Sequence, residues 1–151
     1  MKSVFNQADV AELTDRINML TPQSKPLWGK MSAGQMLAHC NVSYELTYEA
    51  EKHPKPNAFV KLLLRFLVKP TVTGPKPYPR NMRTAPAFLM TEDKTFEMEK
   101  TRLLDYLNKT LSLGPEYFND RESHSFGRLS TAEWNTMFYK HLDHHLHQFD
   151  V

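Results

Sequence analysis

Cysteine and long apolar runs are what this sequence most clearly lacks. Cys40 is the one cysteine in 151 residues, so no disulfide can form within the chain. A lone cysteine is more often a small buried hydrophobe than a ligand or a nucleophile. No apolar run approaches the ~20 residues that a transmembrane helix needs. Residues 1–16 are polar and periodic, unlike a signal peptide, and we therefore expect a soluble, cytoplasmic protein.

The sequence also lacks internal repeats, low-complexity tracts and any alternating pattern strong enough to predict a sheet. Its 40% hydrophobic and 24% charged residues are ordinary values for a globular protein. A chain of this length can bury a substantial core. We therefore expect residues 1–151 to form a single domain.

Acidic residues are absent between residues 52 and 91, where eight basic residues lie. The net charge of the chain is +2, so the remaining eleven basic and seventeen acidic residues carry a net charge of −6. Within this basic segment, Arg65, Arg80 and Arg83 are candidates for binding a carboxylate or phosphate, because a guanidinium can bind either with two hydrogen bonds. Solvated loop charges are an equally good interpretation. We expect no nucleic-acid partner, since no recognition motif is present.

Apolar spacings of three and four residues, together with capping signals, predict the helices. Ser32 with Gln35, and Ser130 with Glu133, match the capping box, in which each side chain satisfies a free backbone amide at the start of a helix. Gly114-Pro115 is expected to end the helix before it. The predicted helices span residues 8–20, 33–51, 58–68, 93–113 and 131–149.

Four of these helices carry one apolar stripe each, which predicts an all-α four-helix bundle. Residues 52–86 would form a long crossover that carries the extra short helix at residues 58–68. The prolines after this helix, starting at Pro70, predict an extended connection. For the short helix itself we favour core packing or a homodimer contact over binding to a membrane surface.

Four histidines lie close together near the end of the chain, at His141, His144, His145 and His147. Projected at about 100° per residue, one arc of the last helix contains Trp134, Met137, Phe138, His141, His145 and Gln148. His144 lies at the edge of this arc and His147 points away from it. The same projection turns His39 inward on the second predicted helix. His39, His141 and His145 thus form a candidate metal site, with three separate structural histidines as the alternative.

Two segments also carry a family resemblance: Trp28-Gly-Lys-Met-Ser-Ala-Gly-Gln-Met-Leu-Ala-His39 and His141-Leu-Asp-His-His145-Leu-His-Gln148. They resemble the DinB/YfiT-like superfamily of metal-binding four-helix-bundle proteins, and a subgroup of it described as a domain of unknown function. The resemblance implies that a histidine of the second helix and an H-x-x-x-H pair of the last helix bind a divalent metal. His39, His141 and His145 match these positions. The superfamily often has glycine where this chain has His147.

Three histidine ligands leave one coordination position for water or substrate, as in catalytic sites. Histidine ligation suits zinc or nickel best, with iron as a further option. We expect a metal-dependent transferase, including thiol transfer, or a hydrolase acting on a small anionic or thiol-bearing molecule. The alternative is a non-catalytic binding or interaction protein with a structural metal or none. Gln35 and Ser43 lie one turn from His39 and are candidates for contacting a ring nitrogen or bound water, although we slightly favour their being ordinary helix residues. No catalytic acid or base is predicted.

Overall fold

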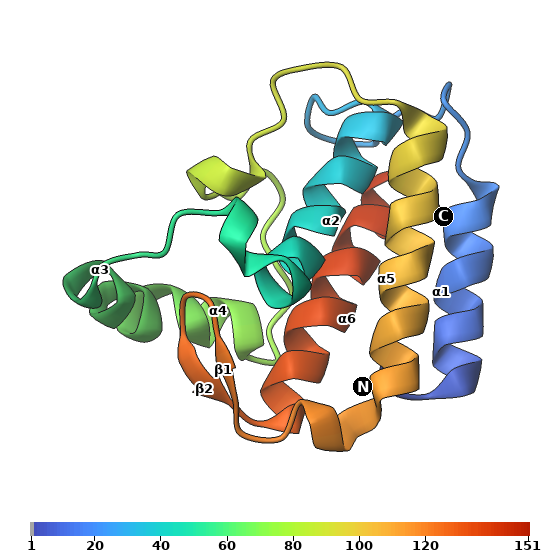
Figure 1. Ribbon diagram of the computed structural model, residues 1–151. Helices are drawn as coiled ribbons and strands as arrows, with labels where there is room; N and C mark the ends of the chain where they lie inside the picture. The colour runs from blue at the N-terminus through green and yellow to red at the C-terminus, as the bar shows by residue number, and fades with distance from the viewer. Residues whose placement is uncertain (1) are drawn as a thin grey trace.

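The computed structural model describes residues 2–151, which are mostly helical and include one small two-stranded antiparallel sheet (Figure 1). The predominantly helical fold predicted from the sequence is therefore confirmed. The main elements in chain order are α1 (Gln7–Met19), α2 (Ala33–Tyr48), α3 (Ala58–Leu63), α4 (Lys69–Thr73), α5 (Phe96–Tyr117), β1 (Arg121–Ser123), β2 (Gly127–Leu129) and α6 (Thr131–Gln148).

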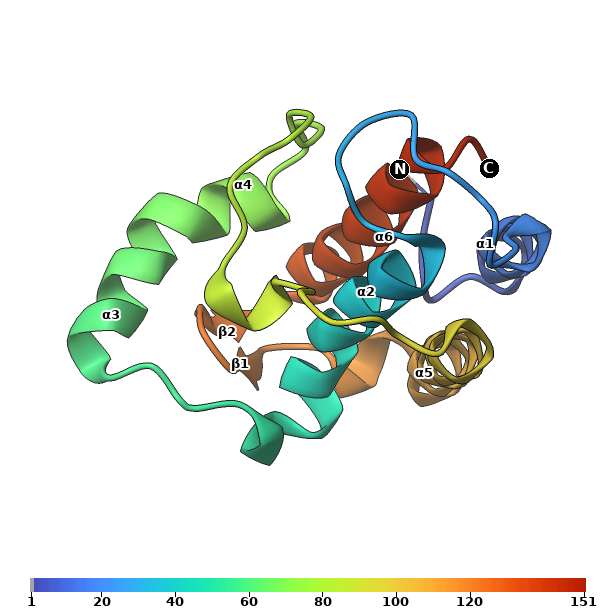
Figure 2. The ribbon, with the colours of Figure 1, turned by 90° about the horizontal axis from the view of Figure 1, so that it is seen from above.

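The long helices α1, α2, α5 and α6 enclose the hydrophobic core. Helix α2 contacts both α5 and α6, and α1 lies against the same two helices (Figure 2). The largest side chains that are fully buried include Leu13 of α1, Tyr44 of α2, Leu107 of α5 and Phe138 of α6. Because each helix contributes its apolar stripe to one core, the faces of α2 and α6 are fixed relative to each other.

Capping boxes start both of the helices that carry the predicted site. The Ser32 hydroxyl accepts from the Gln35 amide and the Gln35 side chain accepts from the Ser32 amide at the start of α2. Ser130 and Glu133 form the same reciprocal pair at the start of α6. Both capping predictions are confirmed, and they fix the position at which each helix begins.

The ends of two helices differ from the prediction. Helix α2 stops at Tyr48, short of residue 51, because Glu49 leaves the helical region at φ −137° and ψ 42°; the 3-10 turn Ala50–Lys52 follows. Helix α5 starts at Phe96, three residues later than predicted. Its regular part ends as expected at Gly114, whose φ of +72° is a left-handed conformation that glycine adopts without strain.

The helix in the crossover is longer than predicted. It runs from α3 through the π-helical segment Leu64–Val68 into α4, and the prediction that Pro70 would end it is wrong. Pro70 lies in the first turn of α4, where its missing amide proton is not needed. After α4 the chain becomes extended, as expected, until the 3-10 turn Pro86–Phe88.

The two sides of this crossover helix have different environments. Leu64, Val68 and Val72 line a cavity between the crossover and helices α2 and α6. The opposite side is exposed, so core packing is wrong for that face; a contact with a second copy of the chain stays a prediction. Its exposed apolar side chains are Phe59, Leu62, Leu63, Phe66 and Leu67. Within residues 2–151 no helix has the length and apolar character needed to span a bilayer.

A short hairpin precedes the last helix, although no pattern in the sequence predicts a sheet. Strands β1 and β2 pair antiparallel with Arg121 opposite Leu129 and Ser123 opposite Gly127. The Ser123 hydroxyl donates to the Gly127 carbonyl at 2.7 Å and closes the turn. Strands of three residues are too short to show an alternating pattern in the sequence. The turn of the hairpin lines the cavity beside α6.

Candidate metal centre

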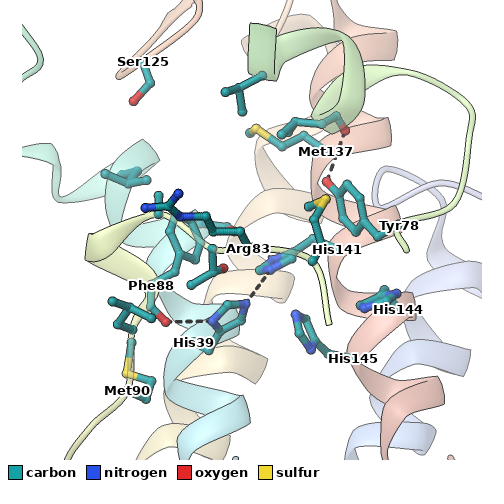
Figure 3. Close-up of a pocket in the computed structure, with 18 of the residues that line it drawn as sticks. His39, Tyr78, Arg83, Phe88, Met90, Ser125, Met137, His141, His144 and His145 are labelled. Atoms are coloured by element: carbon teal, nitrogen blue, oxygen red, sulfur yellow. Dashed lines mark hydrogen bonds between the residues drawn. The ribbon is translucent and has the colours of Figure 1, made fainter. Parts of the chain in front are cut away.

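The three histidines predicted as ligands lie together between α2 and α6 (Figure 3). His39 comes from α2, and His141 and His145 lie four residues apart on α6. One ring nitrogen from each residue lies within 4.8 Å of the other two. The ring centroids are 4.5 to 5.0 Å apart. The structure thus brings together His39 and His141, which are 102 positions apart in the sequence, in a group that could hold a metal ion.

Hydrogen bonds fix the protonation of two of the rings. His39 Nδ1 lies 2.9 Å from the carbonyl oxygen of Phe88, and His145 Nδ1 lies 2.7 Å from Oε1 of Gln148. Both oxygens only accept hydrogen bonds, so each Nδ1 carries the proton and donates. In the neutral ring the other nitrogen, Nε2, then has a free lone pair. Nε2 of His39 and Nε2 of His145 are therefore the ring nitrogens that could accept a proton or coordinate a metal ion.

The third ring is held in the same way by a hydroxyl. His141 Nδ1 lies 3.0 Å from Oγ of Ser43, one turn beyond His39 on α2. Its Nε2 lies 3.0 Å from Nε2 of His39. Because His39 Nδ1 holds the proton of its ring, His141 Nε2 donates to His39 Nε2, and His141 Nδ1 accepts from the Ser43 hydroxyl. A hydroxyl can also accept, so a shift of the His141 proton from Nε2 to Nδ1 would free Nε2 for a metal. In all three rings Nδ1 faces a protein oxygen, and the Nε2 atoms of His39 and His141 face each other.

Electrostatics favours neutral rings. Burial lowers the pKa of His39 below its ordinary value. Burial, together with the nearby His39 ring, lowers the pKa of His145 to about 3. Burial and the neighbouring histidines hold the pKa of His141 well below its usual range. Because only a neutral imidazole can coordinate a metal, a low pKa keeps these rings ready to bind at neutral pH.

Gln148 connects the site to the loop before α2. Its side-chain amide donates to the carbonyl of Trp28 at 2.7 Å, which fixes Oε1 as the atom that faces His145. Gly29 follows with φ +81°, and a Cβ there would lie 2.7 Å from Nε2 of Gln148. The glycine thus leaves room for the amide that orients His145. No sequence pattern predicts these roles for Gln148 and Gly29, although both residues lie in the two segments that carry the family resemblance.

The other two histidines of the cluster lie outside this group of three. His144 lines the cavity and packs edge-on against the rings of Trp28 and Tyr78 at 5.7 and 5.6 Å. His147 is exposed, and its Nδ1 donates to the Asp143 carbonyl at 2.8 Å. These positions agree with the helical projection, which set His144 at the edge of the inward arc and turned His147 away.

The remaining predicted site residues have different locations. Gln35 caps α2 and donates to the carbonyl of Glu92, so its side chain is engaged away from the three rings. Arg83 lines the cavity, whereas Arg80 stacks on the Trp28 ring with its guanidinium carbon 4.4 Å from the ring centroid. Arg65 is exposed on the crossover helix. The structure therefore brings one of the three arginines into the lining of the cavity beside the histidines.

Phe88 contacts the histidines, and the sequence did not predict this contact. Its carbonyl accepts from His39, and its ring packs against His39 and His141 at 5.3 and 5.7 Å. It belongs to the 3-10 turn Pro86–Phe88, at the end of the proline-containing connection. Nothing in the local sequence signals the contact, because it depends on how the crossover folds back over α2.

Comparison with known proteins identifies a family and no function. No curated protein and no solved structure shows significant similarity to this chain. The model of a family described as "Protein of unknown function (DUF1569)" matches residues 3–151. Because that match covers almost the whole sequence, the chain belongs to the DUF1569 family.

Proposed function

We propose that this protein binds a divalent metal through Nε2 of His39, His141 and His145 and acts on a small molecule as a metal-dependent transferase, including thiol transfer, or hydrolase. One observation carries the proposal: each of the three rings has its Nδ1 on a separate protein oxygen. Hydrogen bonds of this kind orient the histidine ligands of metal sites and select the coordinating nitrogen. Three unrelated core histidines would not need all three Nε2 atoms directed toward one point.

The three imidazole donors limit the choice of metal ion. Three neutral imidazoles suit zinc or nickel, and iron is a further option. When bound, such an ion would supply Lewis-acid activation of water, a thiol or a substrate carbonyl. The protein itself orients the ligand rings and shields one side of the site with the Phe88 ring, 5.3 Å from His39. The Ser43 hydroxyl can donate to His141 Nδ1 when the proton of that ring is on Nε2. It can instead accept from Nδ1 when Nε2 is free to bind a metal.

The space next to the histidines favours a reactive site over a structural one. A structural site is closed by a fourth protein ligand, but within residues 2–151 the group contains His39, His141 and His145 alone. All three also line a cavity of about 460 Å³, which leaves room for a substrate. This is why we prefer an enzyme to the alternative of a binding or interaction protein with a structural metal or none.

The arrangement of helices supports the finer fold assignment. Helices α1, α2, α5 and α6 pack against one another, the crossover joins α2 to α5, and the histidines come from the second and last of these helices. We therefore include in the proposal that the chain is a DinB/YfiT-like four-helix bundle. In this proposal His39, His141 and His145 occupy the positions that the resemblance implies for the metal ligands.

Elemental analysis of the tag-free protein tests the proposal directly. We expect near-stoichiometric zinc, nickel or iron in the wild type, and less than a tenth of that amount in His39→Ala and His141→Ala. The matched control is His147→Ala, which alters the same cluster on the exposed side of α6 and should keep its metal. Absence of metal after reconstitution, or equal loss in all three variants, would contradict the proposed site.

A further inference from the structure

The cavity beside the histidines extends well beyond them. It lies between α2, α6 and the crossover, and its volume of about 460 Å³ is within the range of small-molecule sites. Figure 3 shows the histidines at one end and Ser125 and Met137 at the other. A molecule that fills this space therefore reaches from the three rings to the turn of the hairpin.

Apolar side chains form most of the wall. Leu46 comes from α2, Met137 from α6, and Leu64 and Val72 from the crossover helix, while Phe88 lies next to the histidines. These residues come from separate segments of the chain, so the apolar surface encloses the cavity on several sides. A ligand gains affinity here by removing apolar surface from water, and its body must itself be apolar.

The charges around the cavity have one sign. No aspartate or glutamate lines it anywhere in the described residues 2–151, whereas Lys30 and Arg83 do. An ammonium group placed here would lose its hydration without gaining a carboxylate partner, and it would approach two cationic side chains. A neutral or anionic ligand avoids both penalties.

The cationic side chains also restrict the polar group of a ligand. The Lys30 ammonium and the Arg83 guanidinium can only donate hydrogen bonds, so their partner on a ligand must be an acceptor such as a carboxylate or carbonyl oxygen.

From these observations we infer that the cavity binds an apolar acyl or aromatic molecule with an oxygen-bearing neutral or anionic group, such as a carboxylate or carbonyl. The inference rests on the proposed function only in calling this molecule the substrate of the metal centre. It selects against cations and against strongly polar molecules such as sugars, which the walls cannot solvate.

The preference for neutral or anionic ligands can be tested with octanoate, octanol and octylamine. These three molecules share an eight-carbon chain and differ in the charge of the head group. Trp28 and Trp134 are the two tryptophans of the chain and both line the cavity, so tryptophan fluorescence reports binding directly. We expect saturable fluorescence changes with octanoate and octanol, and binding of octylamine at least tenfold weaker. Equal affinity for octylamine and octanoate, or no saturable change with any of the three, would overturn the inference.

A pair of variants locates the binding. Met137→Trp adds bulk to the cavity wall one turn before His141, and we expect at least a tenfold loss of octanol affinity. Leu67→Trp adds the same bulk on the outer face of the crossover helix, where Leu67 is 71% exposed, and should leave octanol affinity unchanged. Binding that survives Met137→Trp in a folded protein would place the ligand elsewhere and refute the assignment.

Metal content separates this inference from the proposed function. Octanol titrations are run on protein stripped of metal and on protein with a measured metal load. Octanol binding by metal-free protein supports the ligand class even if no metal is ever found. A protein that retains stoichiometric metal but binds neither octanol nor octanoate keeps the proposed metal centre and contradicts the ligand class.

Discussion

Gln148 Oε1 accepts from His145 Nδ1 at 2.7 Å, and the same side chain donates to the Trp28 carbonyl at 2.7 Å. The amide thus links the last turn of α6 to the loop before α2. Since the amide orientation is fixed by the carbonyl, the His145 tautomer is fixed as well. The geometry of one proposed ligand therefore depends on a residue that would never touch the metal.

Replacing Gln148 with leucine should weaken metal binding while the fold persists. Leucine keeps a similar volume but removes the acceptor, so His145 can place its proton on Nε2 and lose its ability to coordinate. Loss of such an outer contact typically lowers metal affinity by about 10–100-fold, measurable by competition with a chromogenic chelator. His147→Ala is the control and should bind metal as the wild type does. An unchanged metal affinity in Gln148→Leu would contradict the proposal that Gln148 positions His145.

Gly29→Ala should affect both stability and metal affinity. Alanine at φ +81° carries a backbone strain of about 1–2 kcal/mol, and its Cβ would displace the Gln148 amide. Gly114→Ala is a matched control, because φ there is +72° and an added Cβ would meet no atom within 4 Å. Denaturant titration should show a loss of stability in both variants, because both glycines have positive φ. Metal affinity should fall in Gly29→Ala alone, and an equal fall in both would contradict the role of this contact.

Much of the helix framework could be predicted from the sequence because the signals were local. Ser32 and Ser130 set the start of α2 and α6 through contacts with residues three positions away. Once a helix start is known, the fixed rotation per residue determines which side chains face inward. This is why the sequence placed His39, His141 and His145 on facing surfaces. Whether they bind a metal stays a prediction.

The features that the sequence did not predict depend mainly on contacts between distant residues. His39 receives its acceptor from Phe88, 49 residues away, at the end of a segment without periodic hydrophobicity. The helix continues past Pro70, which lies in the first turn of α4 after the π-helical segment, and the outer face of that helix is exposed although it is strongly apolar. Local propensity describes the residues around a position and carries no information on where the crossover folds back.

Lys140→Met should loosen the crossover over the cavity. The Lys140 ammonium is buried and donates to the carbonyls of Thr71, Gly74 and Lys76 at 2.6 to 3.1 Å. Hydrogen bonds from a charged donor contribute roughly 1.5–3 kcal/mol each, so their loss should lower the free energy of unfolding by at least that amount.

Hydrogen exchange measures where the effect lies. Amides of residues 64–78 should exchange faster in Lys140→Met, while those of α5 should keep their protection. Lys55→Met removes an exposed lysine from the same crossover and serves as the control. Uniform loss of protection across the chain would mean that Lys140 supports the whole fold and has no specific role in holding the crossover.

Glu45 should make stability depend on pH in the acid range. Burial alone would raise the pKa of its carboxyl, but hydrogen bonds from Arg102 and His53 outweigh burial and hold the pKa below the ordinary value of 4.5. Arg102 is shared with Glu99, which also faces this group. A carboxyl with a lowered pKa stabilises the folded state above its ordinary pKa, and the contribution disappears as pH falls through the folded pKa.

The comparison of wild type with Glu45→Gln isolates this carboxyl from the buried histidines, which titrate in both proteins. At pH 7 the substitution should lower the free energy of unfolding by roughly 1.5–3 kcal/mol, the usual contribution of a hydrogen bond to a charged group. The difference should shrink steadily as pH is lowered from about 4.5. Glu116→Gln, which changes an exposed glutamate of α5, should show no such dependence. A difference between wild type and Glu45→Gln that stays constant from pH 7 to pH 3 would mean that Glu45 acts through packing, and that its charge contributes nothing to the contact between α2 and α5.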